Sequence, residues 1–261
     1  MIPRDPATRR QFKTGLLFAS PAILGFALFT LCPLLASLHP SPDPVLRMTG
    51  SESLPLPGIG AVLWNTLVFM ALSVPLTILV ALALALLLNL PVRGRRFYQA
   101  VFFLPSLVPV AASALVWQWF FPWHRGLTQP GHIDIKYVLV LVSAWAAGAN
   151  MILYRAAMRG IPQDLYDAAD TEGAGAWQRA TRVTLPALAP VIFFTLVAGV
   201  AGAFQVFAWP LLALGDEQDK LGVLATLGRP SLGWTLFLAS AVCTGAVLFA
   251  GRRFLRTHHE H

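Results

Sequence analysis

Long apolar runs are the feature that most constrains this chain, because about 20 apolar residues in a row can cross a lipid bilayer as one helix. Hydrophobic residues make up 56% of the 261 residues and charged residues only 12%, whereas soluble domains carry about 25% charged residues. The runs alternate with polar or proline-rich segments, so each is interpreted as a membrane span. The six predicted spans cover residues 15–38, 61–90, 97–121, 137–158, 187–214 and 233–250.

These runs predict an all-α polytopic membrane protein in which residues 1–261 form one transmembrane domain. The first run follows a basic N-terminal segment, as in a signal sequence, but it is too long for the apolar core of a signal peptide. We therefore expect an uncleaved first helix. Such a chain can bury its apolar surface in lipid or between its own packed helices.

Basic residues are distributed unevenly among the segments that connect the spans. If both termini are cytoplasmic, fourteen of the nineteen Lys and Arg residues lie on the cytoplasmic side and five outside. This bias fits the positive-inside rule, and it predicts a multi-pass protein of the bacterial cytoplasmic (inner) membrane. It also explains the net charge of +7 as topology, so no nucleic-acid partner is expected.

The polar segment 161–186, on the predicted cytoplasmic side, has the signals of a helix–turn–helix hairpin. Pro162 suits the first turn of a helix, and Asp164 is a candidate cap. Gly173 ends that helix where a tight turn needs a positive φ. A second short helix is predicted from about residue 176 to 183, and Pro186 marks the start of the next apolar run.

Three short pieces of this hairpin resemble the coupling loop, known as the EAA loop, of ABC importer permeases. The family pattern is Glu-Ala-Ala, two residues, Asp-Gly-Ala and a later Leu-Pro. The matching pieces here are Asp167-Ala168-Ala169, Glu172-Gly173-Ala174 and Leu185-Pro186. Asp167 stands where the family usually has Glu and Glu172 where it usually has Asp, so both positions keep their charge. Ile161-Pro162 and Trp177 are similar to the carbohydrate-importer branch, of maltose and glycerol-phosphate type, which has the type I fold.

The resemblance implies a permease subunit that works in a larger assembly. Its implied partners are a second permease, two ATPase subunits and an extracytoplasmic solute-binding protein. The resemblance implies that closure of the ATPase dimer pushes the hairpins together and rocks the spans. The residues that would dock on the ATPase are Asp167, Ala168, Ala169, Glu172 and Gly173, and Pro186 would set the angle into the fifth span.

No catalytic constellation is visible in the sequence. A phosphate-binding loop needs Gly-x-x-x-x-Gly-Lys, and Lys13, Lys136 and Lys220 are not preceded by glycine. We expect no enzyme activity and no cofactor in this chain, with ATP and Mg²⁺ bound by the partner ATPase. The histidines of residues 258–261 are expected to be a solvated tail rather than a metal site, and the acidic residues of the hairpin a docking face rather than a cation site.

The predicted spans contain almost no ionisable side chains, whereas ion-coupled transporters usually keep acidic or His residues at mid-membrane. This favours energy from outside the bilayer and a neutral small-molecule solute such as a sugar. Aromatic rings stack on sugar rings and amides bind hydroxyl groups, although aromatic residues in spans are also common in packing and interfacial belts. The candidate residues of the path are Trp145, Asn150, Tyr154, Phe204, Gln205, Phe207 and Trp209.

Two other functions fit parts of the sequence. One is an ABC permease for a non-sugar solute such as an amino acid or a polyamine, although charged pairing residues for such solutes are not seen. The other is a non-transport membrane scaffold or a membrane enzyme, which would need a soluble domain or a catalytic cluster. The chain also departs from the sugar branch after Leu214, where the usual Gly-Gly-Pro-type external segment is not found.

Overall fold

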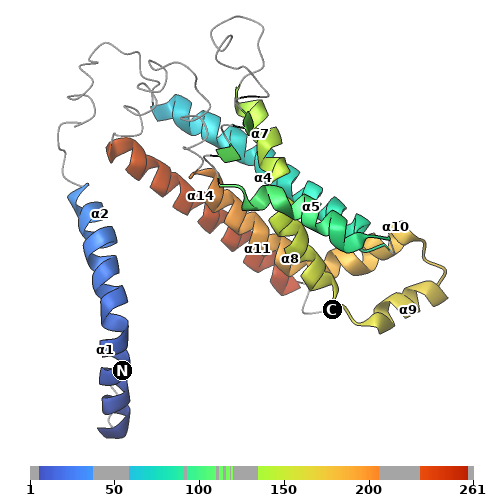
Figure 1. Cartoon of the computed structure of the whole chain (residues 1–261), viewed down its shortest axis with the longest axis horizontal. Helices are drawn as coiled ribbons and strands as arrows, with labels where there is room; N and C mark the ends of the chain where they lie inside the picture. Colours follow the sequence, from blue (N-terminus) through green and yellow to red (C-terminus); the bar gives the residue numbers. More distant parts are fainter. Residues whose placement is uncertain are drawn as a thin grey trace, which may run out of the picture.

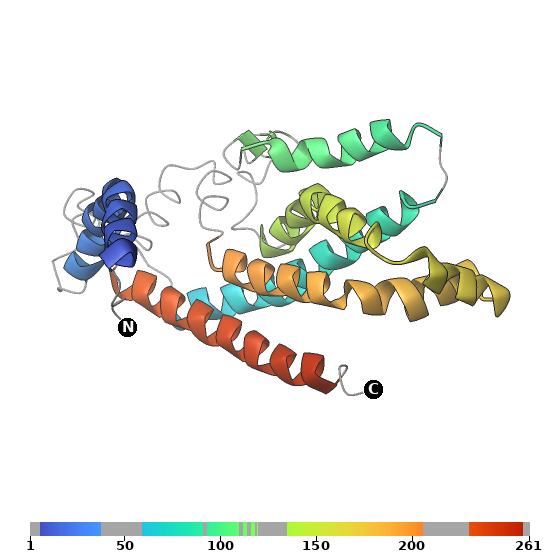
Figure 2. The ribbon, with the colours of Figure 1, turned by 90° about the horizontal axis from the view of Figure 1, so that it is seen from below.

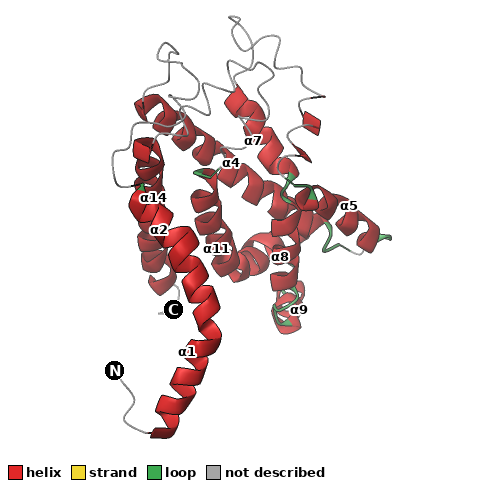
Figure 3. Ribbon diagram, turned by 60° about the vertical axis from the view of Figure 1, so that its left-hand side comes forward, coloured by secondary structure: helices red, strands yellow, loops and turns green. Residues whose placement is uncertain are grey.

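The structure is a computed structural model that describes residues 6–37, 59–90, 93–109, 112–113, 116–117, 119, 135–205 and 230–257. Within these ranges every regular element is a helix (Figure 3). Four helical segments are long and apolar enough to cross a membrane, or five if the bent pair α7 and α8 counts as one span. The all-α polytopic prediction is therefore confirmed.

The elements overlap each of the predicted apolar runs, although α1 begins nine residues before the first run (Figure 1). The first run is one helical stretch with a π-helical turn in its middle, and the second is a single long helix. The helices, in chain order, are α1 (Pro6–Phe26), η1 (Ala27–Leu31), α2 (Cys32–Ala36), α4 (Ile59–Leu87), α5 (Arg95–Leu107), α7 (Ile135–Trp145), α8 (Gly148–Met158), α9 (Gln163–Thr171), α10 (Ala176–Arg179), η3 (Ala180–Thr184), α11 (Leu185–Ala203) and α14 (Pro230–Thr257).

Two predicted spans are not single helices. The third, predicted for residues 97–121, is interrupted after Leu107, because Val108 is extended and the residue before a proline avoids helical backbone. Residues 112–113 and 116–117 beyond the interruption are again helical. The fourth, predicted for 137–158, is bent by 44° between α7 and α8. The bend brings Gly148 so close to α5 that a β-carbon there would overlap the backbone of Phe102. A proline follows the first break and a glycine follows the second. Such residues are tolerated within a membrane span where neighbouring helices satisfy the backbone groups that are left without a hydrogen bond.

Prolines near the other helix ends are accommodated by π-helical turns. In η3 the N–H of Leu185 donates to the carbonyl of Ala180, and Pro186 follows directly. In η1 the N–H of Cys32 donates to the carbonyl of Ala27, and Pro33 follows. A π turn of this kind re-pairs the backbone where a proline lacks its N–H. The helix therefore continues through each proline.

The best-buried core lies where α4, α8 and α11 meet. Small residues on α4, Ala81 and Ala85, are fully buried and let the other two helices approach. They pack against Met151 and Tyr154 of α8 and Leu188 of α11, which are also fully buried. Close packing of small side chains is how membrane helices associate without a hydrophobic driving force between them.

Large apolar side chains cover the outside of the bundle. Leu79 of α4, Leu104 of α5 and Phe194 of α11 are about three-fifths exposed, which is the expected state for residues that face lipid. The helical run from α1 to α2 stands apart from the rest at one end (Figures 1 and 2), where Trp234 Nε1 of α14 donates to Ser37 Oγ at 3.1 Å. The polar hairpin of α9 and α10 projects at the opposite end.

Candidate functional site

The hairpin of residues 161–186 is polar, and it projects beyond the bundle at the end where α14 finishes (Figure 1). Its first arm is α9, and its second arm is α10 followed by η3. The second arm runs without a break into α11, so residues 176–203 form one continuous helical stretch. The hairpin is thus attached directly to a membrane-crossing helix.

The turn between the arms is fixed by backbone hydrogen bonds. The N–H of Ala174 donates to the carbonyl of Ala169 at 2.9 Å, and the N–H of Gly173 donates to that of Asp170 at 3.0 Å. These two bonds are the Schellman arrangement that closes a helix, which needs a left-handed residue just beyond the helix end. Gly173 has φ +75°, which confirms the prediction that this glycine ends α9.

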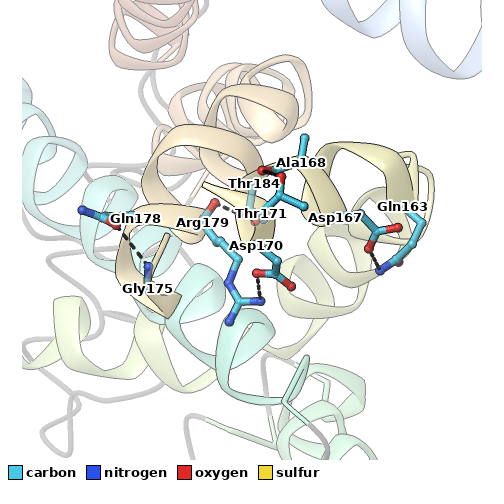
Figure 4. Close-up of polar contacts among 9 residues, drawn as sticks. All are labelled: Gln163, Asp167, Ala168, Asp170, Thr171, Gly175, Gln178, Arg179 and Thr184. Carbon is cyan, nitrogen blue, oxygen red and sulfur yellow. Dashed lines mark hydrogen bonds and ion pairs between the residues drawn. The ribbon is translucent and has the colours of Figure 1, made fainter. Parts of the chain in front are cut away.

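Two side-chain contacts join the arms, and Figure 4 shows one of them, between Arg179 and Asp170. The guanidinium of Arg179 lies 2.7 Å from the carboxylate of Asp170, and the hydroxyl groups of Tyr166 and Thr184 are 3.0 Å apart. The amide oxygen of Gln178 also accepts from the N–H of Gly175 at 3.1 Å, which caps the second arm. These contacts define the angle between the arms. They were not predicted from the sequence, where Asp170 counted only as one member of an acidic cluster.

The residues predicted to dock on an ATPase line the outer part of the hairpin. Asp167, Ala168, Glu172 and Gly173 are exposed, and Ala169 is half-buried. Asp167 accepts a hydrogen bond from Gln163 at 3.3 Å. Two apolar side chains are exposed beside them, Leu165 (50%) and Trp177 (77%). An acidic surface with exposed apolar groups is suited to contact with another protein.

Two details of the predicted hairpin are wrong, whereas Pro186 stands at the start of the next helix as predicted. Asp164 is not the cap, because Pro162 occupies that position and Asp164 lies in the first helical turn. The second arm is not a separate short helix, because η3 carries it into α11. Pro186, which is exposed, stands at the start of α11 within the continuous helix. The π turn before it removes the break that a proline usually causes.

The predicted path residues are spread along α7, α8 and the end of α11. Trp145 packs edge-to-face on Trp117, with ring centroids 5.4 Å apart. Asn150 is half-buried, Phe204 is buried and Gln205 is exposed. Phe207 and Trp209 lie outside the described residues. The assignment of these side chains to a solute path stays a prediction.

Tyr154 is a path candidate that forms a hydrogen bond to another helix. It is completely buried, and its hydroxyl lies 2.6 Å from Thr195 Oγ1 of α11. Thr195 in turn donates to the carbonyl of Ile192 at 2.9 Å. When Thr195 gives its one proton to the carbonyl of Ile192, Tyr154 is the donor to Thr195, because a hydroxyl carries one proton. This contact ties α8 to α11.

No group of three or more His, Cys, Asp or Glu side chains among the described residues is placed to hold a metal ion. In the hairpin, Asp170 is paired with Arg179 and Asp167 with Gln163. Asp167 and Asp170 are therefore each engaged with a neighbouring polar group rather than converging on one point.

The family model for the binding-protein-dependent transport system inner membrane component matches residues 73–259. The lactose transport system permease protein LacF of Rhizobium radiobacter is 30% identical over 78% of this chain and 77% of its own length. The sn-glycerol-3-phosphate transport system permease protein UgpA of Salmonella typhi is 36% identical over 70% of this chain and 63% of its own. A crystal structure of a bacterial ABC transporter that imports the acidic polysaccharide alginate aligns with a TM-score of 0.69 at 21% identity, covering 95% of this chain and 99% of that one.

Proposed function

The chain belongs to the family of binding-protein-dependent transport system inner membrane components, and on that premise we propose that it is the permease subunit of an ATP-driven importer of a sugar or another neutral, polyol-like solute. It forms the translocation path with a second permease. A pair of ATPase subunits, which bind ATP and Mg²⁺, docks on the hairpin, and an extracytoplasmic binding protein delivers the solute.

The hairpin carries this proposal. Four of its docking residues are exposed and Ala169 is half-buried. The turn and the angle between its arms are held by the bonds at Gly173 and by the Asp170–Arg179 and Tyr166–Thr184 contacts. A rigid, projecting element with exposed acidic and apolar groups can receive a push from a partner without collapsing.

The continuous helix from residue 176 to 203 supplies the mechanical link. A displacement of the second arm passes directly into α11, since no flexible loop separates the two. The buried contact between Tyr154 and Thr195 then passes it to α8. Rigid-body rocking of packed helices is a standard way to open a pathway alternately to either side, and this is the motion we assign to the ATP-driven step.

The carbohydrate class is supported by the relatives that carry sugar-transport names, such as the lactose permease. The neutral character of the solute is supported by the predicted spans, which hold no Asp, Glu or Lys and a single Arg, Arg155, at the end of the fourth. Because a glycerol-phosphate permease is among the relatives, a phosphorylated polyol is the alternative solute to include in a transport assay.

Charge-removing and charge-conserving variants together test the dock. We expect Asp167→Asn with Glu172→Gln to lose the ATPase from the purified complex and to abolish ATP-driven uptake into proteoliposomes. Asp167→Glu with Glu172→Asp, which keeps both charges, should retain both activities. Uptake that survives removal of the charges, or an ATPase that never accompanies the chain, would contradict the docking role.

Topology is tested separately by thiol labelling. In a Cys32→Ser, Cys243→Ser background, Glu172→Cys should react with a membrane-impermeant maleimide only when the cytoplasmic face is accessible, as in inverted vesicles. Labelling from the outer face of intact cells would overturn the cytoplasmic placement of the hairpin.

The solute class is identified by an uptake assay on the purified complex in proteoliposomes. Radiolabelled sugars and glycerol phosphate are offered in turn, and the compound that accumulates shows the class.

A further inference from the structure

Arginines gather where α5 begins and α8 ends, outside the hairpin and the predicted path. Arg95 is the first residue of α5, and Arg155 lies in the last turn of α8. Arg155 is only 4% exposed, and its Nη1 donates to Gln99 Oε1 one turn along α5. The Nε atoms of both arginines are buried without a hydrogen-bond partner. Buried donors of this kind are rare and call for a partner.

The charge of this cluster has no counterpart within the described part of the chain. No described carboxylate pairs with Arg155, and the sequence has a single acidic residue, Asp134, between residues 53 and 163. Arg95 and Arg159 add like charge close enough to repel Arg155. A cation in the last turn of a helix is favourable for the helix dipole, which accounts for the position of Arg155. It does not account for its burial, since a buried charge is costly unless it is paired.

The surroundings indicate which anion completes the site. Phe97 and Tyr98 follow Arg95 and form an exposed edge-to-face pair, and aromatic rings at the ends of spans lie at the level of the lipid headgroups. Gly94, the N-terminal cap of α5, offers no side chain to the first amide groups of that helix, and helix N-termini favour phosphate. Basic sites between membrane helices at their cytoplasmic ends bind anionic headgroups.

We propose that Arg95 and Arg155 bind the phosphate of an anionic phospholipid headgroup between the start of α5 and the end of α8, with Gln99 holding the Arg155 guanidinium in place. Arg95 and Gln99 are four residues apart, so they lie on one face of α5, and the close approach of Gly148 to Phe102 fixes that face against α8. The proposal rests on embedding in a membrane but not on transport, so the two can fail independently.

Lipid binding is measured directly on the full-length chain, purified in detergent with its accompanying subunits. The complex is titrated with phosphatidylglycerol and, separately, with phosphatidylcholine of the same acyl chains, and bound lipids are counted by native mass spectrometry. We expect phosphatidylglycerol to be preferred. Arg155→Gln and Arg95→Gln should each weaken its binding at least about tenfold, the order expected for the loss of a hydrogen bond to a charged group.

Arg96→Gln is the matched control, because Arg96 is exposed on the same helical turn and should leave binding unchanged. If Arg155→Gln does not fold, the half-exposed Arg95 carries the test alone. Equal binding of the two lipids, or equal loss in the Arg96 variant, overturns the proposal. Competition by inorganic phosphate at matched concentration would instead assign the site to a free anion. Unchanged lipid binding with loss of a subunit would assign the two arginines to a carboxylate of a partner subunit. Phosphate competition and subunit loss would each refute the proposal of a lipid site.

Discussion

Gly173 in the hairpin and Gly148 in the bundle show two different reasons for a small residue in one chain. At Gly173 a β-carbon would meet nothing within 4 Å, and the backbone has φ +75°. At Gly148 the backbone is ordinary helix, and a β-carbon would overlap the backbone of Phe102 and Phe103. The hairpin glycine is therefore required by its own backbone, and the bundle glycine by a neighbouring helix.

The same contrast extends to the regions around the two glycines. The hairpin is exposed and is held by a turn, an ion pair and a hydroxyl contact, all between residues near in sequence. The bundle is held by close contact between helices far apart in sequence. Damage to the hairpin should therefore leave a folded but uncoupled protein, whereas damage to the bundle should reduce the amount of folded protein.

Gly148→Val is the largest expected effect. The added side chain meets backbone, which cannot rotate away, so α5 and α8 must separate. Overpacking of this kind costs about 1–3 kcal/mol or more. We expect little monodisperse protein after detergent extraction and a lowered midpoint in thermal unfolding followed by tryptophan fluorescence.

Gly202→Val is the matched control for this prediction. Gly202 is also helical, but a β-carbon there would meet nothing within 4 Å. Its valine variant should extract and unfold like the wild type apart from a small difference in helix propensity. Equal behaviour of the two variants would show that α5 and α8 do not approach each other closely.

Thr195→Val comes second, and it tests the buried tie between α8 and α11. The variant keeps the shape of the side chain but leaves the Tyr154 hydroxyl as a buried donor without an acceptor, which costs about 1–3 kcal/mol. Tyr154→Phe removes the donor instead and leaves Thr195 bonded to Ile192, so we expect a smaller loss of about 0.5–1.5 kcal/mol. Thermal unfolding of both variants gives the ranking, and the reverse ranking would mean that Thr195 is the donor to Tyr154.

The sequence predicts local features of this molecule well. The end of α9 was predictable because glycine readily adopts the positive φ that a helix end requires. The acidic residues around Gly173 also match a family pattern. That the chain forms long apolar helices was predictable, because the length and apolarity of a membrane-crossing helix are set by a bilayer rather than by particular contacts. The continuity through Pro186 was not, because a π turn depends on how the helix re-pairs its backbone and leaves no mark in residue type.

Long-range features were hidden for a different reason. The bend at Gly148 depends on Phe102 of another helix, and the Tyr154–Thr195 bond joins two spans. An apolar run reads the same whether its helix is straight or bent, so hydropathy cannot place either feature. Arg155, which has no carboxylate partner among the described residues, was visible in the sequence only as an isolated charge near the end of a span. Its burial follows from the packing of α5 on α8.

Gly173→Val ranks third for stability but should have the greatest effect on coupling. A β-branched residue at a left-handed position costs about 1–2 kcal/mol, and the loss is confined to an exposed turn. We expect normal extraction and a bound solute-binding protein, with ATP-driven uptake abolished. Gly173→Asn, of similar bulk, tolerates the left-handed conformation and should retain most uptake. If the asparagine variant fails as badly as valine, bulk at the docking surface, rather than backbone geometry, is what matters.

The Asp170–Arg179 pair gives the smallest effect. Its side chains are 53% and 36% exposed, and exposed ion pairs contribute about 0.2–1 kcal/mol. A double-mutant cycle of Asp170→Asn and Arg179→Gln, followed by thermal unfolding, should give a coupling energy in that range. Because water and ions reach both groups, the coupling should nearly vanish in molar salt. A coupling that persists in molar salt would mean that the pair is shielded in the assembled protein, which would place the dock across the arms of the hairpin rather than along α9 alone.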